Sequence, residues 1–177
     1  MGGPNAPSPS QQSNATFDIQ PGNYVMFCGV DIPDGIPHIA KGMFKPLTVT
    51  ASTGPAAKAP TPDVSIGLKE YAFEVSTPIT AGSHVLEVRN TGAQDHEIEI
   101  IKLEPGKTID DFGKWMAKPA GPPPASAVGG VIAGKGGQAY FTADFTPGNY
   151  VMLCFIPDAK DGKPHMVHGM VQNFTVN

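Results

Sequence analysis

The feature that most constrains this chain is an internal repeat. Residues 21–43 read PGNYVMFCGVDIPDGIPHIAKGM, and residues 147–170 read PGNYVMLCFIPDAKDGKPHMVHGM. The two segments align with a one-residue gap in the loop between the Cys and the Pro-His pair. Each copy carries one Cys, one His after a Pro, and one Met five positions beyond that His. Such self-similarity indicates that one supersecondary unit is written twice in the chain.

The two copies differ in what precedes them. Residues 64–146, before the second copy, read as further strands, whereas residues 1–15, before the first, are mostly Gly, Pro, Ser and Gln. We therefore expect residues 1–49 to be the C-terminal half of a truncated first repeat. Residues 50–63 then form a Pro/Ala linker, and residues 64–177 form the complete domain.

Composition narrows the fold and the class of partner. The chain has 177 residues, enough for one full domain and a fragment. Its 21 Gly and 19 Pro, with few long amphipathic runs, favour many short strands joined by turns. The net charge of -4 and the scattered Lys and Arg give no basic stripe, so no nucleic-acid partner is expected. No apolar run approaches the roughly 20 residues of a membrane span.

Residues 64–177 carry a recurrent alternation of apolar and polar residues that is typical of strands. The predicted strands cover residues 64–75, 84–90, 96–103, 138–145, 149–155 and 171–176. In HEIEIIKL, residues 96–103, the Ile side is expected to be buried and the Glu side to face water. These short strands predict an all-β, Greek-key β-sandwich.

Residues 104–137 interrupt this pattern and are interpreted as a surface insertion. Thr108, with acidic residues after it and Lys in the last turn, predicts a short helix within residues 106–118. The segment PAGPPPASAVGG, residues 119–130, is too rich in Pro and Gly for us to expect regular structure there.

The two Cys residues allow three interpretations. Cys28 and Cys154 occupy the same position in the two copies, so a disulfide between them would require two domain interiors to meet. A free, buried Cys that packs as a small apolar residue is the plain alternative. Each Cys is followed by a His and a Met, however, and a thiolate, an imidazole and a thioether form a soft ligand set that suits copper.

A copper site of this kind needs a second imidazole, and His96 is the natural donor. It precedes Ile98 and Ile100 at the same strand parity, so all three side chains point to the same face. An isolated His in this position would be interpreted as a core residue, and the Cys-His-Met loop is what favours a ligand. Of the two His residues in the loop, His165 has a counterpart in the first copy, whereas His168 corresponds to Lys41.

The segment NTGAQDH before an alternating strand, together with Cys, His and Met in order in the last loop, resembles the cupredoxins, the blue copper proteins. The resemblance covers nearly all of residues 64–177. It implies that His96, Cys154 and His165 bind one type 1 copper ion, with Met170 as a weak axial ligand.

The same resemblance implies a function and a location. The chain would transfer single electrons to or from a redox partner protein and would not be an enzyme. A periplasmic or extracellular location follows, with the export signal lost together with the missing half-domain. A copper carrier or sensor, and a binding domain with a vestigial metal site, remain as alternatives.

Overall fold

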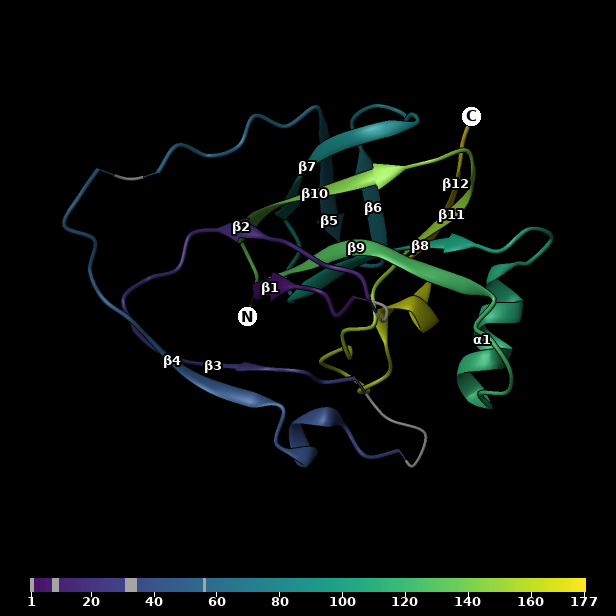
Figure 1. Ribbon diagram of the computed structural model, residues 1–177, viewed down its shortest axis with the longest axis horizontal. Helices are drawn as coiled ribbons and strands as arrows, with labels where there is room; N and C mark the ends of the chain where they lie inside the picture. Colours follow the sequence, from purple (N-terminus) through teal and green to yellow (C-terminus); the bar gives the residue numbers. More distant parts are fainter. Residues whose placement is uncertain (1, 8–9, 31–34, 56) are drawn as a thin grey trace. The chain divides into compact units, whose positions relative to one another are not determined.

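The computed structural model describes residues 2–7, 10–30, 35–55 and 57–177. The chain forms two compact units: the first contains the residues up to Phe17 together with Pro60–Asn177, and the second is Asp18–Ala59. The first unit consists of two five-stranded sheets (Figure 1). The predicted all-β sandwich is confirmed.

One sheet has the strand order β1-β9-β8-β11-β12 and the other β2-β10-β7-β5-β6. The first sheet comprises β1 (Gly2–Pro4), β9 (Ala125–Ala133), β8 (His96–Leu103), β11 (Gly148–Leu153) and β12 (Val171–Val176). The second comprises β2 (Thr16–Phe17), β10 (Gln138–Phe145), β7 (Gly82–Asn90), β5 (Val64–Lys69) and β6 (Ala72–Val75). Neighbouring strands are antiparallel except β5 and β7, which are parallel.

The inner faces of both sheets contribute to one apolar core. Its fully buried members include Leu68 from β5, Leu86 from β7, Ile98 from β8, Phe141 from β10 and Met152 from β11. Cys154 and Met170 belong to this same cluster. The candidate ligands therefore lie at one end of the core that holds the two sheets together.

The predicted strand 64–75 is wrong in one respect, because it is a hairpin. Strands β5 and β6 pair antiparallel, with Lys69 opposite Ala72, and Glu70 and Tyr71 form the two-residue turn. Tyr71 has φ of 63°, a left-handed conformation that is uncommon for an aromatic residue. No Gly or Asn marks this turn in the sequence, so the alternation alone predicts one continuous strand.

The expectation of irregular structure over residues 119–130 is confirmed for residues 119–124 and wrong for the rest, because β9 begins at Ala125 and pairs with β8. The glycines that suggested a loop are needed for that pairing. A Cβ on Gly130 would lie 1.9 Å from the carbonyl oxygen of Ile98, so only glycine permits this approach. The insertion is correspondingly shorter than the predicted 104–137.

The predicted helix is confirmed as α1 (Ile109–Ala117). Thr108 Oγ1 accepts a hydrogen bond from the backbone N–H of Asp111 at 3.3 Å, and the Asp111 carboxylate accepts one from the Thr108 N–H at 2.9 Å. This reciprocal capping box defines where the helix begins. Phe112 is buried with Ile101 and Leu103 in a second, smaller apolar cluster.

Strand β8 is buried on both faces, so the expectation that its Glu residues face water is wrong. Glu97 and Glu99 are 9% and 8% exposed. Glu97 accepts a hydrogen bond from the Phe155 N–H at 3.0 Å, and Glu99 accepts one from the Asn5 side chain at 2.5 Å. Burial raises the pKa of both carboxyl groups, that of Glu99 to about 8.

We predict that Glu99 makes the stability of the protein fall as the pH rises. Its carboxyl group stays protonated in the folded chain up to about pH 8, but in the unfolded chain only up to its ordinary pKa of 4.5. Its contribution is therefore fully present below pH 4.5 and is lost between there and pH 8. Glu99→Gln should remove this dependence and stabilise the protein at pH 9 by about 2 to 5 kcal/mol relative to wild type.

Urea unfolding at pH 4.5, 7 and 9 measures this effect. Glu74→Gln removes the same charge from an exposed residue that pairs with Lys69, and it should leave the pH dependence as in wild type. Parallel pH profiles for wild type and Glu99→Gln would contradict the prediction.

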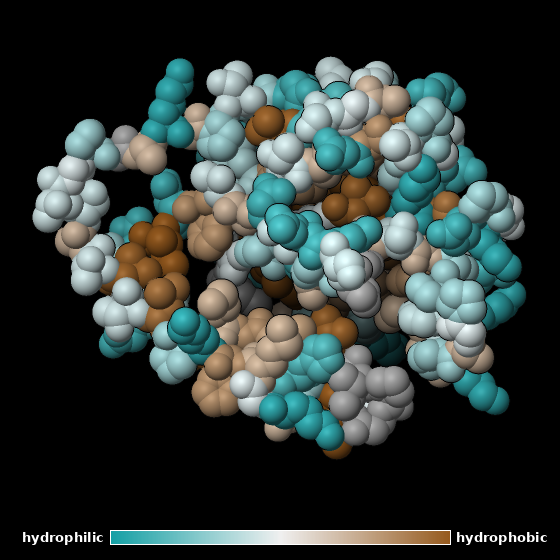
Figure 2. Space-filling model, in the orientation of Figure 1, coloured by the Kyte–Doolittle hydropathy of each residue, from teal (hydrophilic) through white to brown (hydrophobic). Residues whose placement is uncertain are grey.

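The second unit is a hairpin of β3 (Gly22–Phe27) and β4 (Phe44–Val49), with a 3-10 turn, η1 (His38–Lys41), in its loop. Much of its apolar surface is exposed, as Figure 2 shows for side chains of this hairpin. Val25, Met26, Phe27, Met43 and Phe44 are each more than half exposed. This hairpin repeats β11, β12 and the 3-10 turn η2 (His165–His168) of the first unit.

The proposed boundaries 1–49, 50–63 and 64–177 stay a prediction, and parts of the first two ranges lie outside the described residues. Within the first unit, β1 pairs with β9 and β2 pairs with β10. The segment up to Phe17 thus adds an edge strand to each sheet of the first unit. Among the helices described, none is both long and apolar enough to cross a membrane.

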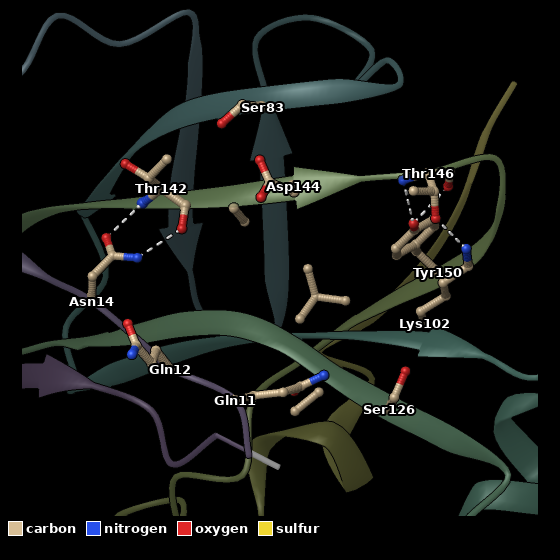
Figure 3. A pocket seen from close by; sticks show the side chains of 13 residues that line it. Gln11, Gln12, Asn14, Ser83, Lys102, Ser126, Thr142, Asp144, Thr146 and Tyr150 are labelled. Carbon is tan, nitrogen blue, oxygen red and sulfur yellow. Dashed lines mark hydrogen bonds between the residues drawn. The ribbon is translucent and has the colours of Figure 1, made fainter. Parts of the chain in front are cut away.

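The segment between β1 and β2 also lines a polar pocket of about 450 Å³ (Figure 3). Asn14 there exchanges two hydrogen bonds of 2.8 Å with the backbone of Thr142 on β10. Lys102 donates a 2.5 Å hydrogen bond to Thr146 on the opposite side. None of the predicted copper ligands lines this pocket.

Candidate metal centre

The pairing of β8 with β11 brings two of the predicted ligands together. The strands run antiparallel with Glu99 opposite Leu153, so the start of β8 lies beside the end of β11. His96 begins β8, and Cys154 follows the last residue of β11. The backbone N–H of Glu97 donates a hydrogen bond to Cys154 Sγ at 3.3 Å. Glu97, the residue after His96, therefore fixes the position of the Cys154 thiol.

The loop after β11 returns the third ligand to the same place. The His165 N–H donates to the Ile156 carbonyl at 2.9 Å, and the Met166 N–H donates to the Cys154 carbonyl at 2.9 Å. The Met170 N–H then donates to the His165 carbonyl at 3.1 Å. Gly169, with φ of 101°, ends η2 in the left-handed conformation that turns the chain into β12. Backbone bonds thus hold both ends of the loop.

The side chains of His96, Cys154 and His165 converge on one point. Cys154 Sγ lies 3.4 Å from His165 Nδ1, and the Nδ1 atoms of the two imidazoles lie 3.1 Å apart. All three donor atoms fall within 4.8 Å of one another. Each of the three residues is fully buried. Two imidazole nitrogens and one sulfur that face a common centre form a ligand set for a soft transition metal.

Burial also sets the protonation of the donors. It lowers the pKa of both His96 and His165, so both imidazoles are neutral and can act as ligands at neutral pH. Burial raises the pKa of the Cys154 thiol to about 11. A metal ion must therefore displace the thiol proton, as is general for cysteine ligands.

The outer nitrogens of the two imidazoles have an unusual environment. Within the described ranges, the Nε2 atoms of His96 and His165 are buried and make no hydrogen bond. A carboxylate lies near each of them: Glu70 Oε1 is 3.6 Å from His96 Nε2, and Asp158 Oδ2 is 3.7 Å from His165 Nε2. The donor set fits a metal held through both Nδ1 atoms, with the Nε2–H groups directed at carboxylates.

Met170 and His168 lie differently with respect to this centre. Met170 is fully buried in the core cluster that includes Cys154, as an axial ligand requires. The His168 side chain is 28% exposed, and its Nε2 lies 3.1 Å from an oxygen of Asp161. A second group of possible ligands contains His168, Asp158 and Asp161. The two acidic residues belong to one loop, and His168 and Asp161 are accessible to solvent, unlike the three residues of the buried centre.

Sequence reasoning did not find the residues that surround the ligands. Glu70 and Tyr71 lie in a turn within the predicted strand 64–75. No local sequence signal therefore indicates that they approach His96 and His165. Asp158 stands in the Cys-to-His loop, but its burial depends on hydrogen bonds from Tyr71 and Gln94, distant in the sequence. Only the order of strands in space brings these residues to the centre.

The first repeat copies the ligand loop in detail. Cys28 Sγ lies 3.4 Å from His38 Nδ1, the same separation as between Cys154 Sγ and His165 Nδ1 in the first unit. The Ile39 N–H donates to the Cys28 carbonyl at 2.9 Å, and the Met43 N–H donates to the His38 carbonyl at 3.0 Å. Among the described residues of this unit, no further His, Cys, Asp or Glu joins the pair.

No protein-family model matches the sequence, and a comparison with curated proteins also finds no match. Among solved structures, the chain is similar to the dithionite-reduced auracyanin of the photosynthetic bacterium Roseiflexus castenholzii. The identity is 25%, over 64% of this chain and 94% of that one, with a TM-score of 0.44.

Two further similarities are to auracyanin A and to a nitrite reductase. Auracyanin A, a "blue" copper protein of Chloroflexus aurantiacus, is 14% identical over 64% of this chain and 99% of its own, with a TM-score of 0.41. The copper-containing nitrite reductase of Thermus scotoductus is 13% identical over 89% of this chain and 41% of its own, with a TM-score of 0.34.

Gly92 supplies a test of how tightly the centre is packed. A Cβ at this position would lie 2.7 Å from His96 Nε2 and 2.8 Å from Glu70 Oε1. Gly92→Ala should therefore displace the imidazole and weaken metal binding about 10- to 100-fold, as loss of a residue behind a ligand typically does. Competition with a chelator, using zinc or copper, measures the affinity.

Gly113→Ala is the matched control, because a Cβ there meets nothing within 4 Å. It lies in α1, and the change should leave metal affinity as in wild type while stabilising the helix by about 1 kcal/mol. Equal metal affinities for the Gly92 and Gly113 variants would show that the Gly92 contact does not position His96.

Proposed function

We propose that this chain is a mononuclear type 1 copper protein that transfers single electrons. The observation that carries the proposal is the convergence of His96 Nδ1, Cys154 Sγ and His165 Nδ1 in a fully buried position. Met170, buried in the same cluster as Cys154, is the fourth proposed ligand. Two imidazoles, a thiolate and a weak thioether are the ligand set of blue copper electron-transfer sites.

The surroundings of the ligands favour electron transfer over catalysis. When bound, copper supplies a couple between two oxidation states. The chain fixes the donors through the β8–β11 pairing and the backbone bonds of the loop, so the ligands need move little when an electron arrives. Four protein ligands leave no open position for a substrate. We therefore propose an electron carrier with a redox partner protein, and no enzyme activity.

The alternatives predict different behaviour. A copper carrier or sensor must release or exchange its ion, which favours accessible donors, whereas these three residues are fully buried. A vestigial domain would have lost a donor, and all four proposed ligands are present. A periplasmic or extracellular location is proposed as well, because thiolate copper chemistry is best protected from the reducing pool of the cytoplasm.

The Cys pair gives a direct test of the copper site. Copper(II) added to the purified protein should produce an intense visible thiolate-to-copper band, a narrow copper hyperfine splitting in electron paramagnetic resonance, and about one tightly bound ion per chain. Cys154→Ser should abolish the band while the far-UV circular dichroism stays unchanged. Cys28→Ser should keep both the band and the stoichiometry, because the first copy lacks a second His. A colourless wild-type protein would refute the proposal.

The His residues of the loop give a second test. His165→Ala should remove the band and lower copper affinity by at least about tenfold, whereas His168→Ala should leave both nearly unchanged. Met170→Leu keeps the packing and should leave copper bound with a shifted reduction potential. If His168→Ala abolished the band and His165→Ala spared it, the ligand assignment within PHMVHGM would be wrong.

A further inference from the structure

Each of the two imidazoles has a carboxylate behind it. Glu70 lies 3.6 Å from His96 Nε2, and Asp158 lies 3.7 Å from His165 Nε2. Both distances are slightly beyond hydrogen-bond length, so in this structure they are charge contacts. We refer to Glu70 and Asp158 as the outer carboxylates. They come from different sheets and loops, so their symmetrical placement does not follow from the repeat.

Asp158 is held as a buried anion. It is 3% exposed. Its Oδ2 accepts hydrogen bonds from the Tyr71 hydroxyl at 2.6 Å and from Gln94 Nε2 at 2.9 Å, and its Oδ1 accepts one from the Lys160 N–H at 2.8 Å. These donors, Tyr71 foremost, hold the pKa of Asp158 well below its usual range. A full negative charge therefore stands next to His165 at any physiological pH.

Glu70 is held by the loop that leads into His96. Its Oε1 accepts hydrogen bonds from the backbone N–H groups of Ala93 and, at 3.2 Å, Gln94. These bonds lower the pKa of Glu70, so it also carries a negative charge. The absence of a side chain at Gly92 leaves the space through which Glu70 and His96 approach. Glu70 thus fixes both the loop and the outer side of the imidazole.

One turn organises both contacts. Glu70 and Tyr71 are the two residues between β5 and β6, and their side chains lie near different ligands. Glu70 faces His96. The Tyr71 hydroxyl binds Asp158, and its ring lies edge-on to His165 with centroids 5.6 Å apart. A turn of the other sheet therefore lies beside both imidazoles. The left-handed backbone conformation of Tyr71 in this turn has an energetic cost.

We infer that Glu70 and Asp158 are positioning residues that fix both imidazoles with Nδ1 toward the metal and that favour the higher oxidation state of the bound ion. The inference deepens the proposed copper function and rests on it. A carboxylate behind a ligating imidazole selects the tautomer with the proton on Nε2 and makes the ligand nitrogen more basic. Two negative charges near the centre stabilise the doubly charged ion more than the singly charged one. The reduction potential is thereby lowered.

Charge-neutral isosteres test this inference. Asp158→Asn and Glu70→Gln should each raise the midpoint potential of the copper-loaded protein. The ratio of Cu(II) to Cu(I) affinity should fall by about tenfold for Asp158→Asn and by less for Glu70→Gln, because Glu70 is 39% exposed and screened by water.

Two matched controls separate this effect from a loss of net charge. Asp161→Asn lies in the same loop as Asp158, and Glu74→Gln lies in the same hairpin as Glu70. Their carboxylates pair with His168 and Lys69 and face neither ligand. Both variants should keep the wild-type potential. If Asp158→Asn and Glu70→Gln moved the potential no more than these controls, the inference would be overturned while the visible band would still support the copper site.

A zinc-loaded sample tests the tautomer independently of redox chemistry. Nitrogen-15 NMR should show His96 and His165 bound to zinc through Nδ1, with slowly exchanging protons on Nε2. In Asp158→Asn, the Nε2 proton of His165 should exchange at least about tenfold faster, while that of His96 should be unaffected. Metal bound through Nε2 of either residue would overturn the inference. A colourless copper sample with the expected zinc spectra would instead refute only the proposed electron-transfer function.

Discussion

The pairing of β8 with β11 is the constraint on which the rest of this molecule depends. It places the first residue of one strand beside the end of the other, and the Glu97 N–H closes the gap by donating to Cys154 Sγ. Both strands lie inside a sheet, with neighbours on each side, so neither His96 nor Cys154 can move without disturbing the core. The site is thus as rigid as the sandwich, which suits a centre whose charge changes while its ligands stay in place.

The burial of the donors determines their chemistry more than any single contact does. It keeps both imidazoles neutral and the thiol protonated until a metal arrives. The same burial leaves the two Nε2 atoms without hydrogen bonds, which is costly unless nearby charges compensate. Glu70 and Asp158 provide that compensation from outside the ligand set. The apolar core and the two carboxylates therefore together determine the electrostatic environment of the imidazoles.

Much of the candidate site could be predicted from the sequence, because the chain contains two copies of the Cys-to-Met loop that can be compared with each other. The presence of a His at both 38 and 165, but not at both 41 and 168, favours His165 over His168 as the proposed ligand. Two of the failures, over β9 and over Glu99, depend on neighbours distant in the chain. Strand β9 needed the close approach of Gly130 to β8, and the burial of Glu99 needed Asn5. Neither contact leaves a periodic signal.

The hairpin of the second unit has one further consequence. It reproduces the Cys-His separation of 3.4 Å and the backbone bonds of the loop, although its strands lack the sandwich that surrounds the other copy. In both copies, the described parts of the loop therefore share one pattern of hydrogen bonds around the Cys and the His. A designer who placed this arrangement of Cys28 and His38 between adjacent strands of an unrelated β-protein would still need to supply a second imidazole.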